Sequence, residues 1–227
     1  MSDKKSQFGK ASTKNNAASK SNDFLLSEFN ALQQRVLELE RIKSSRINFF
    51  LIVFAASIAG LSGLVGSSNL EYVFPFIVLI VAFVLLLFGI TTLKDVTDYS
   101  IAIVVLFRRA GRVRRWFLDN DSSIEKYVAF EPNDDRPKMY LGRSVLSWRG
   151  GEPILIIANI VTASVFVGAG LSFISIISTL IGIAITIFVL LKSQTWYIEN
   201  RLKKQDTAAQ LNVIFPSNPD DKKQDES

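Results

Sequence analysis

The longest uncharged stretch of the chain covers residues 153–191, which contain no Asp, Glu, Lys or Arg. A helix of these 39 residues would be about 58 Å long, whereas the hydrocarbon core of a bilayer is about 30 Å thick. A single membrane-spanning helix therefore cannot use the whole stretch, and the chain has to cross the membrane and return. Because Gly168 and Gly170 lie near the middle, we expect the turn just after them, between spans at residues 153–170 and 174–192.

Two further uncharged blocks, at residues 47–66 and 72–93, are separated by a short polar turn. Each block is long enough for one crossing, and Pro75 lies in the first turn of the second block, where its missing N–H is harmless. So short a connection makes the two helices antiparallel. The sequence therefore predicts an all-α integral membrane protein with four transmembrane helices arranged as two hairpins.

Lys and Arg are distributed unevenly among the segments outside these spans. Nine precede the first span, eleven lie between the second and third, six lie at or after the end of the fourth, and none occurs in the two short turns. Basic residues are enriched on the cytoplasmic side of membrane proteins. We therefore expect both termini and the central loop, residues 119–152, in the cytoplasm, with the spans in a plasma membrane or bacterial inner membrane.

Two amphipathic segments, residues 23–46 and 94–118, flank the first hairpin on this cytoplasmic side. Apolar residues recur in each at alternating steps of four and three, which is typical of packed helices. Both segments leave the same hairpin, so we expect each to continue its span without a break and the pair to form an antiparallel cytosolic stalk. The residues of this predicted interface are Leu25, Phe29, Leu32, Val36, Leu39, Tyr99, Ile103, Leu106, Ala110, Val113 and Phe117.

Five arginines lie on the second amphipathic segment, opposite or beside its apolar stripe: Arg108, Arg109, Arg112, Arg114 and Arg115. One interpretation is a solvated outer face that follows the positive-inside pattern. Another is a binding surface for anionic lipid headgroups or for an acidic partner. A nucleic-acid partner is not expected, because excess positive charge in a membrane protein more commonly reflects orientation, and no Gly-rich phosphate loop accompanies the arginines.

The chain contains no Cys and no His, which excludes thiolate nucleophiles, His-based triads and the usual zinc sites. Six acids lie within residues 119–135 of the central loop: Asp119, Asp121, Glu125, Glu131, Asp134 and Asp135. Their spacing does not match an EF-hand loop, and we interpret them as turn-forming carboxylates that pair with the arginines. We therefore expect no catalytic, metal or cofactor site.

Ala55, Ala59 and Gly63 form a stripe of small residues along the first span. Such a stripe lets a second helix approach closely, and we favour intramolecular packing over a dimer interface. Ser164, Gly168 and Ser172, and likewise Ser178, Gly182 and Thr186, repeat the pattern in the second hairpin.

The two ends of the chain are polar. Residues 1–22 are rich in Lys, Ser, Asn and Ala, which predicts a disordered tail. Residues 193–227 begin as a cytosolic helix and end as a second disordered tail. Within it Val213, Ile214 and Phe215 form an apolar island that either docks on the stalk or a partner, or has no role.

These features favour a non-enzymatic multi-pass protein that anchors the stalk at the inner leaflet. The stalk would self-associate or bind a protein partner, in contact with membrane lipids. The alternative is a subunit of an oligomeric channel or pore. It is less favoured because the third and fourth spans carry no ionisable residue of the kind that lines most ion pathways.

Overall fold

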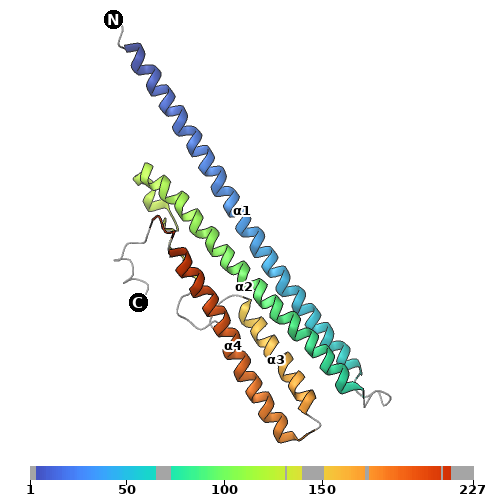
Figure 1. The fold of residues 1–227 in the computed structure, drawn as a ribbon. Helices are drawn as coiled ribbons and strands as arrows, with labels where there is room; N and C mark the ends of the chain where they lie inside the picture. Colours follow the sequence, from blue (N-terminus) through green and yellow to red (C-terminus); the bar gives the residue numbers. More distant parts are fainter. Residues whose placement is uncertain are drawn as a thin grey trace. The chain divides into compact units, whose positions relative to one another are not determined.

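The computed structural model describes residues 4–64, 73–130, 132–139, 151–171, 174–210 and 212–215. Every secondary-structure element in this part of the chain is a helix (Figure 1). The elements are α1 (Lys4–Leu64), α2 (Phe74–Asn120), the 3₁₀ helix η2 (Ser122–Tyr127), α3 (Glu152–Leu171) and α4 (Ile176–Gln210). The all-α class predicted from the sequence agrees with this architecture.

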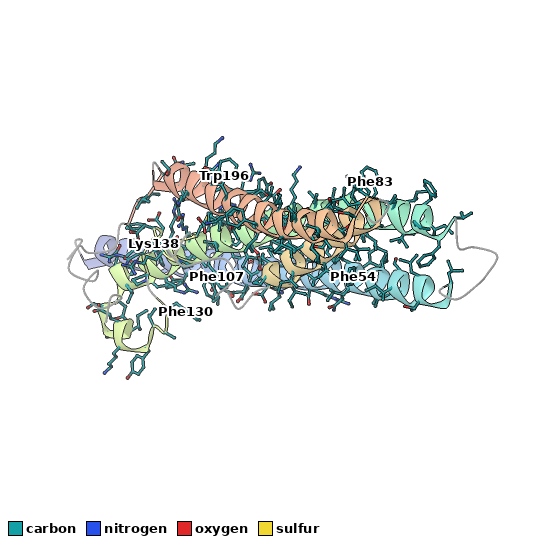
Figure 2. All side chains as sticks on the ribbon, turned by 90° about the horizontal axis from the view of Figure 1, so that it is seen from below. Phe54, Phe83, Phe107, Phe130, Lys138 and Trp196 are labelled. Atoms are coloured by element: carbon teal, nitrogen blue, oxygen red, sulfur yellow. The ribbon has the colours of Figure 1, made fainter. Side chains whose placement is uncertain are left out.

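Four helices, α1 to α4, are long and apolar enough to cross a membrane, with mean hydropathies of 2.1, 3.0, 2.3 and 2.2 in their most apolar windows. Large apolar side chains cover their outer surfaces, and Phe83 on α2 is half exposed (Figure 2). In the apolar window of α4 no residue is buried. Exposed apolar surface on this scale is unusual for a monomeric protein in water.

α1 begins at Lys4, inside the segment for which the sequence predicts a disordered tail. Composition alone led to that prediction, because residues 1–22 contain too few apolar side chains to pack against anything. The segment also contains no Pro, so its backbone can form the helical hydrogen bonds that α1 has there. The apolar content of a segment indicates whether it can pack against other elements. It does not indicate whether the segment forms a helix by itself.

The chain divides into two compact units, and α1 and α2 contribute residues to both. Unit 1 comprises Met1–Glu38, Ile103–Pro137 and Asn212–Ser227, and unit 2 comprises Leu39–Ala102 and Lys138–Leu211.

The core of unit 2 joins all four long helices. Phe50 of α1 is fully buried and its ring centroid lies 5.6 Å from that of Phe88 on α2. A Cβ at Gly182 of α4 would lie 2.4 Å from Leu171 Cδ1 of α3. α3 and α4 therefore approach each other more closely than a larger residue at position 182 would allow.

A buried polar cluster, the Glu152 network, ties three helices of unit 2 together. Glu152 in the first turn of α3 is only 2% exposed. Its carboxylate accepts a hydrogen bond from Ser100 of α2 and lies 3.1 Å from the ammonium of Lys43 on α1. The acid also lies in the first turn of α3, at the positive end of the helix dipole, where acidic side chains stabilise a helix.

The small-residue stripe of α1 is not packed as expected. Ala55, Ala59 and Gly63 are exposed, and a Cβ added at Gly63 would meet no atom within 4 Å. In the described part of the chain, intramolecular packing is therefore the wrong prediction for this stripe. Phe50, on the opposite side of α1, makes the intramolecular contacts instead.

Candidate functional site

The two amphipathic stripes meet in unit 1. Leu32 of α1 is buried together with Ala110 and Val113 of α2, with exposed fractions of 9%, 1% and 8%. Four further stripe residues pack against these three: Leu25, Phe29, Leu106 and Phe117. We call these seven residues the seam. Burial of one such leucine contributes about 1.5–3 kcal/mol, so the seam is the main apolar contact described in unit 1.

The remaining stripe residues lie outside this cluster. Val36 and Ile103 are buried in unit 1. Leu39 is buried in unit 2, where Tyr99 is partly buried. No stripe residue is fully exposed, as expected from the spacing.

Pairwise contacts of unit 1 run in opposite order along α1 and α2. Leu25 lines a groove with Trp116. Further along α1, the guanidinium of Arg114 lies 5.3 Å from the ring centroid of Phe29. Leu25 thus lies near Trp116, and Phe29, four residues later, lies near Arg114, two residues earlier on α2. The two helices are therefore antiparallel in unit 1.

The arginines of α2 do not form a uniform solvated face. Arg108 is only 7% exposed, and its Nε donates to the carbonyl oxygen of Pro137 at 3.0 Å. Arg112 donates from Nε to Asp134 Oδ2 at 2.6 Å and from Nη2 to the carbonyl oxygen of Asn212 at 2.7 Å. These two arginines therefore hold the loop after η2 and the segment after α4.

Asp134 is the centre of this arrangement. Its side chain is fully buried and accepts hydrogen bonds from the backbone N–H groups of Ile214 and Phe215, at 3.0 and 2.9 Å. The backbone N–H of Asp134 donates in turn to the carbonyl oxygen of Phe215 at 3.2 Å. We call Arg112, Asp134 and residues 212–215 the clasp.

The electrostatics of the clasp favour an ionised Asp134. Burial alone raises the pKa of this carboxyl, because it disfavours the charged form. The backbone hydrogen bonds from Ile214 and Phe215 and the guanidinium of Arg112 act in the opposite direction. Together they outweigh burial and hold the pKa of Asp134 below its usual range.

The other three arginines differ from one another. Arg114 lies between the rings of Phe29 and Phe130, 5.3 and 4.9 Å from their centroids, and its burial lowers its pKa. Arg115 pairs with Asp119 at 2.9 Å and lies 6.0 Å from the ring of Phe215. Arg109 is exposed.

Three acids of the central loop make specific contacts: Asp119, Asp121 and Asp134. Asp121 caps η2 by accepting a hydrogen bond from the Ser123 N–H at 3.0 Å. Hydrogen bonds from the side chain and the backbone of Ser123 lower the pKa of Asp121. Pairing with arginine is confirmed for Asp119 and Asp134. Glu131 lies outside the described residues. Within those residues no group of three or more acidic side chains could hold a metal ion.

Sequence reasoning identified the arginines and the acids, and it left open whether the apolar island at residues 213–215 docks on the stalk or a partner, or has no role. The apolar island lies in the clasp, because the backbone of Ile214 and Phe215 binds Asp134, some 80 residues earlier in the chain. A hydrophobic triplet in a polar tail was the only signal. The Glu152 network left no signal, because nothing in the spacing of Lys43, Ser100 and Glu152 links them.

No protein-family model, no curated protein and no solved structure matches this chain. The seam, the clasp and the apolar helices are therefore the observations on which a function has to be argued.

Proposed function

We propose that this chain is a non-enzymatic integral membrane protein that self-associates within the bilayer and holds a cytosolic helical stalk at the inner leaflet. α1 and α2 form the first membrane hairpin, and α3 and α4 form the second. Unit 1 is the stalk, and both chain termini lie in the cytoplasm. A protein partner at the stalk is compatible with the same architecture.

Four apolar helices with outward-facing side chains support the anchoring part of the proposal. Ile80 on α2 and Phe188 on α4 are 65% and 63% exposed. Such side chains are stable in hydrocarbon, where their exposure carries no hydrophobic penalty. Exposed apolar side chains occur on all four helices. This distribution favours insertion of the helices into a membrane over burial of one face against a partner protein.

The exposed stripe of Ala55, Ala59 and Gly63 is the observation that carries self-association. Lipid supplies no hydrophobic drive for helix pairing, so membrane helices associate through small residues that permit close backbone contact. The seam residues, by contrast, are already buried against each other within one chain. A partner therefore has better access to the stripe of α1 than to the apolar side of the stalk.

The lipid part of the proposal rests on a reduced set of arginines. Arg108 and Arg112 have partners within the chain, whereas Arg109 is exposed. A Lys or Arg gains about 1 kcal/mol from anionic lipid only close to the membrane surface, so Arg109 would gain it where the stalk lies against the leaflet. Contact with anionic headgroups or with an acidic partner would thus centre on Arg109, because Arg115 is paired with Asp119.

The test is the mass of the full chain in a mild uncharged detergent. We expect an oligomer for the wild type and a smaller species for Ala59→Ile combined with Gly63→Ile. Ala184→Ile on α4 is the matched control, because Ala184 is also exposed but has Leu180 and Phe188 four residues away on either side. It adds the same side-chain volume as the Ala59→Ile change alone, outside any small-residue stripe.

A monomeric wild type would contradict self-association. Equal loss of oligomer in the stripe variant and in the Ala184→Ile control would contradict the assigned interface. Ion leakage from liposomes that contain the wild-type oligomer would instead support the channel subunit, and the scaffold role would be abandoned.

A further inference from the structure

A groove of about 320 Å³ lies between α2 and α4 in unit 2. α2 and α4 run in the same direction here, so the polarity of both helices changes at the same end of the groove. One end is therefore apolar and the other polar. Ile90, Leu93 and Leu190 line the apolar end. Lys94, Gln194 and Tyr197 line the other end, where the predicted second and fourth spans reach residues 93 and 192.

Gln194 is the unusual member of this lining. It is only 7% exposed, and neither its Nε2 nor its Oε1 atom has a hydrogen-bond partner. A buried amide without partners is costly, and most buried polar side chains in proteins are paired. An unpaired amide at the wall of a groove therefore points to a ligand that supplies the missing partner.

Lys94 provides a charge at the same end. It is exposed and has no ion-pair partner among the described residues. The neighbouring acid, Asp95, instead faces Arg46 of α1 at 4.0 Å. The groove thus combines one available cation with an apolar floor.

Aromatic residues place this end at the membrane surface. Trp196 extends outward from α4, 65% exposed, and Tyr197 follows it (Figure 2). Trp and Tyr are enriched at the headgroup level of membranes. A groove that begins in hydrocarbon and ends at the headgroups has the polarity of a lipid molecule.

We propose that the α2–α4 groove binds one anionic phospholipid of the inner leaflet. Lys94 binds the phosphate, the amide of Gln194 hydrogen-bonds to a phosphate or ester oxygen, and an acyl chain lies along Ile90, Leu93 and Leu190. Basic pockets between membrane helices on the cytoplasmic side bind lipid headgroups in this manner. The inference rests on the membrane insertion proposed above.

A soluble anion or a peptide fits the groove less well. A free phosphate would use Lys94 but would make no contact with the apolar floor of Ile90, Leu93 and Leu190. A peptide would need partners for its own backbone, and Gln194 is the one buried side chain of the groove lining with both a donor and an acceptor unpaired. The volume is at the lower end for ligand sites, which suits a headgroup with the first part of one chain.

The test measures lipid binding to the full chain in an uncharged detergent by native mass spectrometry. Phosphatidylglycerol and phosphatidylcholine are the anionic and zwitterionic probes. We expect Lys94→Gln to weaken phosphatidylglycerol binding about fivefold, equivalent to about 1 kcal/mol for one lysine. Lys94→Arg should retain binding, and Gln194→Leu should weaken binding of both lipids.

Lys192→Gln is the matched control, because Lys192 is an exposed lysine of α4 that does not line the groove. Equal losses in Lys94→Gln and Lys192→Gln would show diffuse attraction and overturn the site. Equal competition by inorganic phosphate and by phosphatidylglycerol would also overturn it. Recovery of the wild type in the soluble fraction of cells would contradict membrane insertion itself. If the wild type is membrane-bound but Lys94→Gln and Lys192→Gln lose phosphatidylglycerol binding equally, only the groove proposal is contradicted.

Discussion

At the scale of single residues, Asp134 has the most demanding environment in unit 1. Its carboxylate binds one guanidinium and two backbone N–H groups, all from segments distant in sequence. Hydrogen bonds to an ionised group are each worth about 1.5–3 kcal/mol. The charge of this side chain therefore contributes much of the attachment of residues 212–215, and Arg112 and the Asp134 backbone N–H each add one further hydrogen bond.

The clasp should open in acid. Because the pKa of Asp134 is lower in the folded clasp than in the unfolded chain, its contribution is complete above about pH 5. The contribution is lost as pH falls below about 4 and through the folded pKa. We expect amide exchange at Ile214 and Phe215, corrected for its intrinsic pH dependence, to speed up about tenfold or more over this interval.

Asp134→Asn tests the assignment, because it removes the titrating group while keeping the side-chain shape. It should expose Ile214 and Phe215 to exchange already at pH 7, with no further opening in acid. Glu125→Gln, at an exposed acid of η2, should leave exchange unchanged. A wild-type clasp that stays protected at pH 3 would show that Asp134 does not control it.

At the scale of elements, the seam shows how far periodicity can be used. Leu32 and Ala110 were predicted on facing stripes because the four-and-three spacing defines a helix face, and the structure brings them together. Periodicity does not state what covers a face, so the stripe at Ala59 was wrongly assigned to intramolecular packing. It also cannot reveal a contact such as that of Asp134 with Phe215, which depends on the path of the chain in space.

Leu32→Ala should lower the free energy of unfolding of unit 1 by about 2–5 kcal/mol, since it leaves a cavity in the seam. Leu37→Ala is the control, because Leu37 is 65% exposed and its loss should change stability by less than about 0.5 kcal/mol. Denaturant unfolding in detergent would be followed by the fluorescence of Trp116, after Trp148 and Trp196 are replaced by Phe. Equal stabilities of the two variants would mean that the seam contributes little.

At the scale of the whole molecule, charge and apolar residues are strictly separated along the chain. This separation defines the proposed topology, with both termini on one side of the membrane and the α3–α4 turn on the other. The described end of that turn includes Ser175, which is exposed. Nearly all polar mass would then face the cytoplasm.

Single-cysteine labelling can test this topology directly, because the chain has no native cysteine. In intact cells a membrane-impermeant maleimide should modify Ser175→Cys but not Asn22→Cys or Ala208→Cys. All three positions are exposed, so all should react after permeabilisation. Labelling of Asn22→Cys in intact cells would reverse the proposed orientation.

The Glu152 network implies an order of events during synthesis. The ribosome completes α1 and α2 before it reaches Glu152, so Lys43 and Ser100 can pair with each other, at 2.7 Å, before the carboxylate they share has been made. Until α3 arrives, the ammonium of Lys43 keeps its water, and the helices of the first hairpin lack the ion pair that joins them to the rest of unit 2. A chain cut short before residue 152 would therefore keep the hydrogen bond from Lys43 to Ser100 between α1 and α2 but would lack the acid that joins both helices to α3.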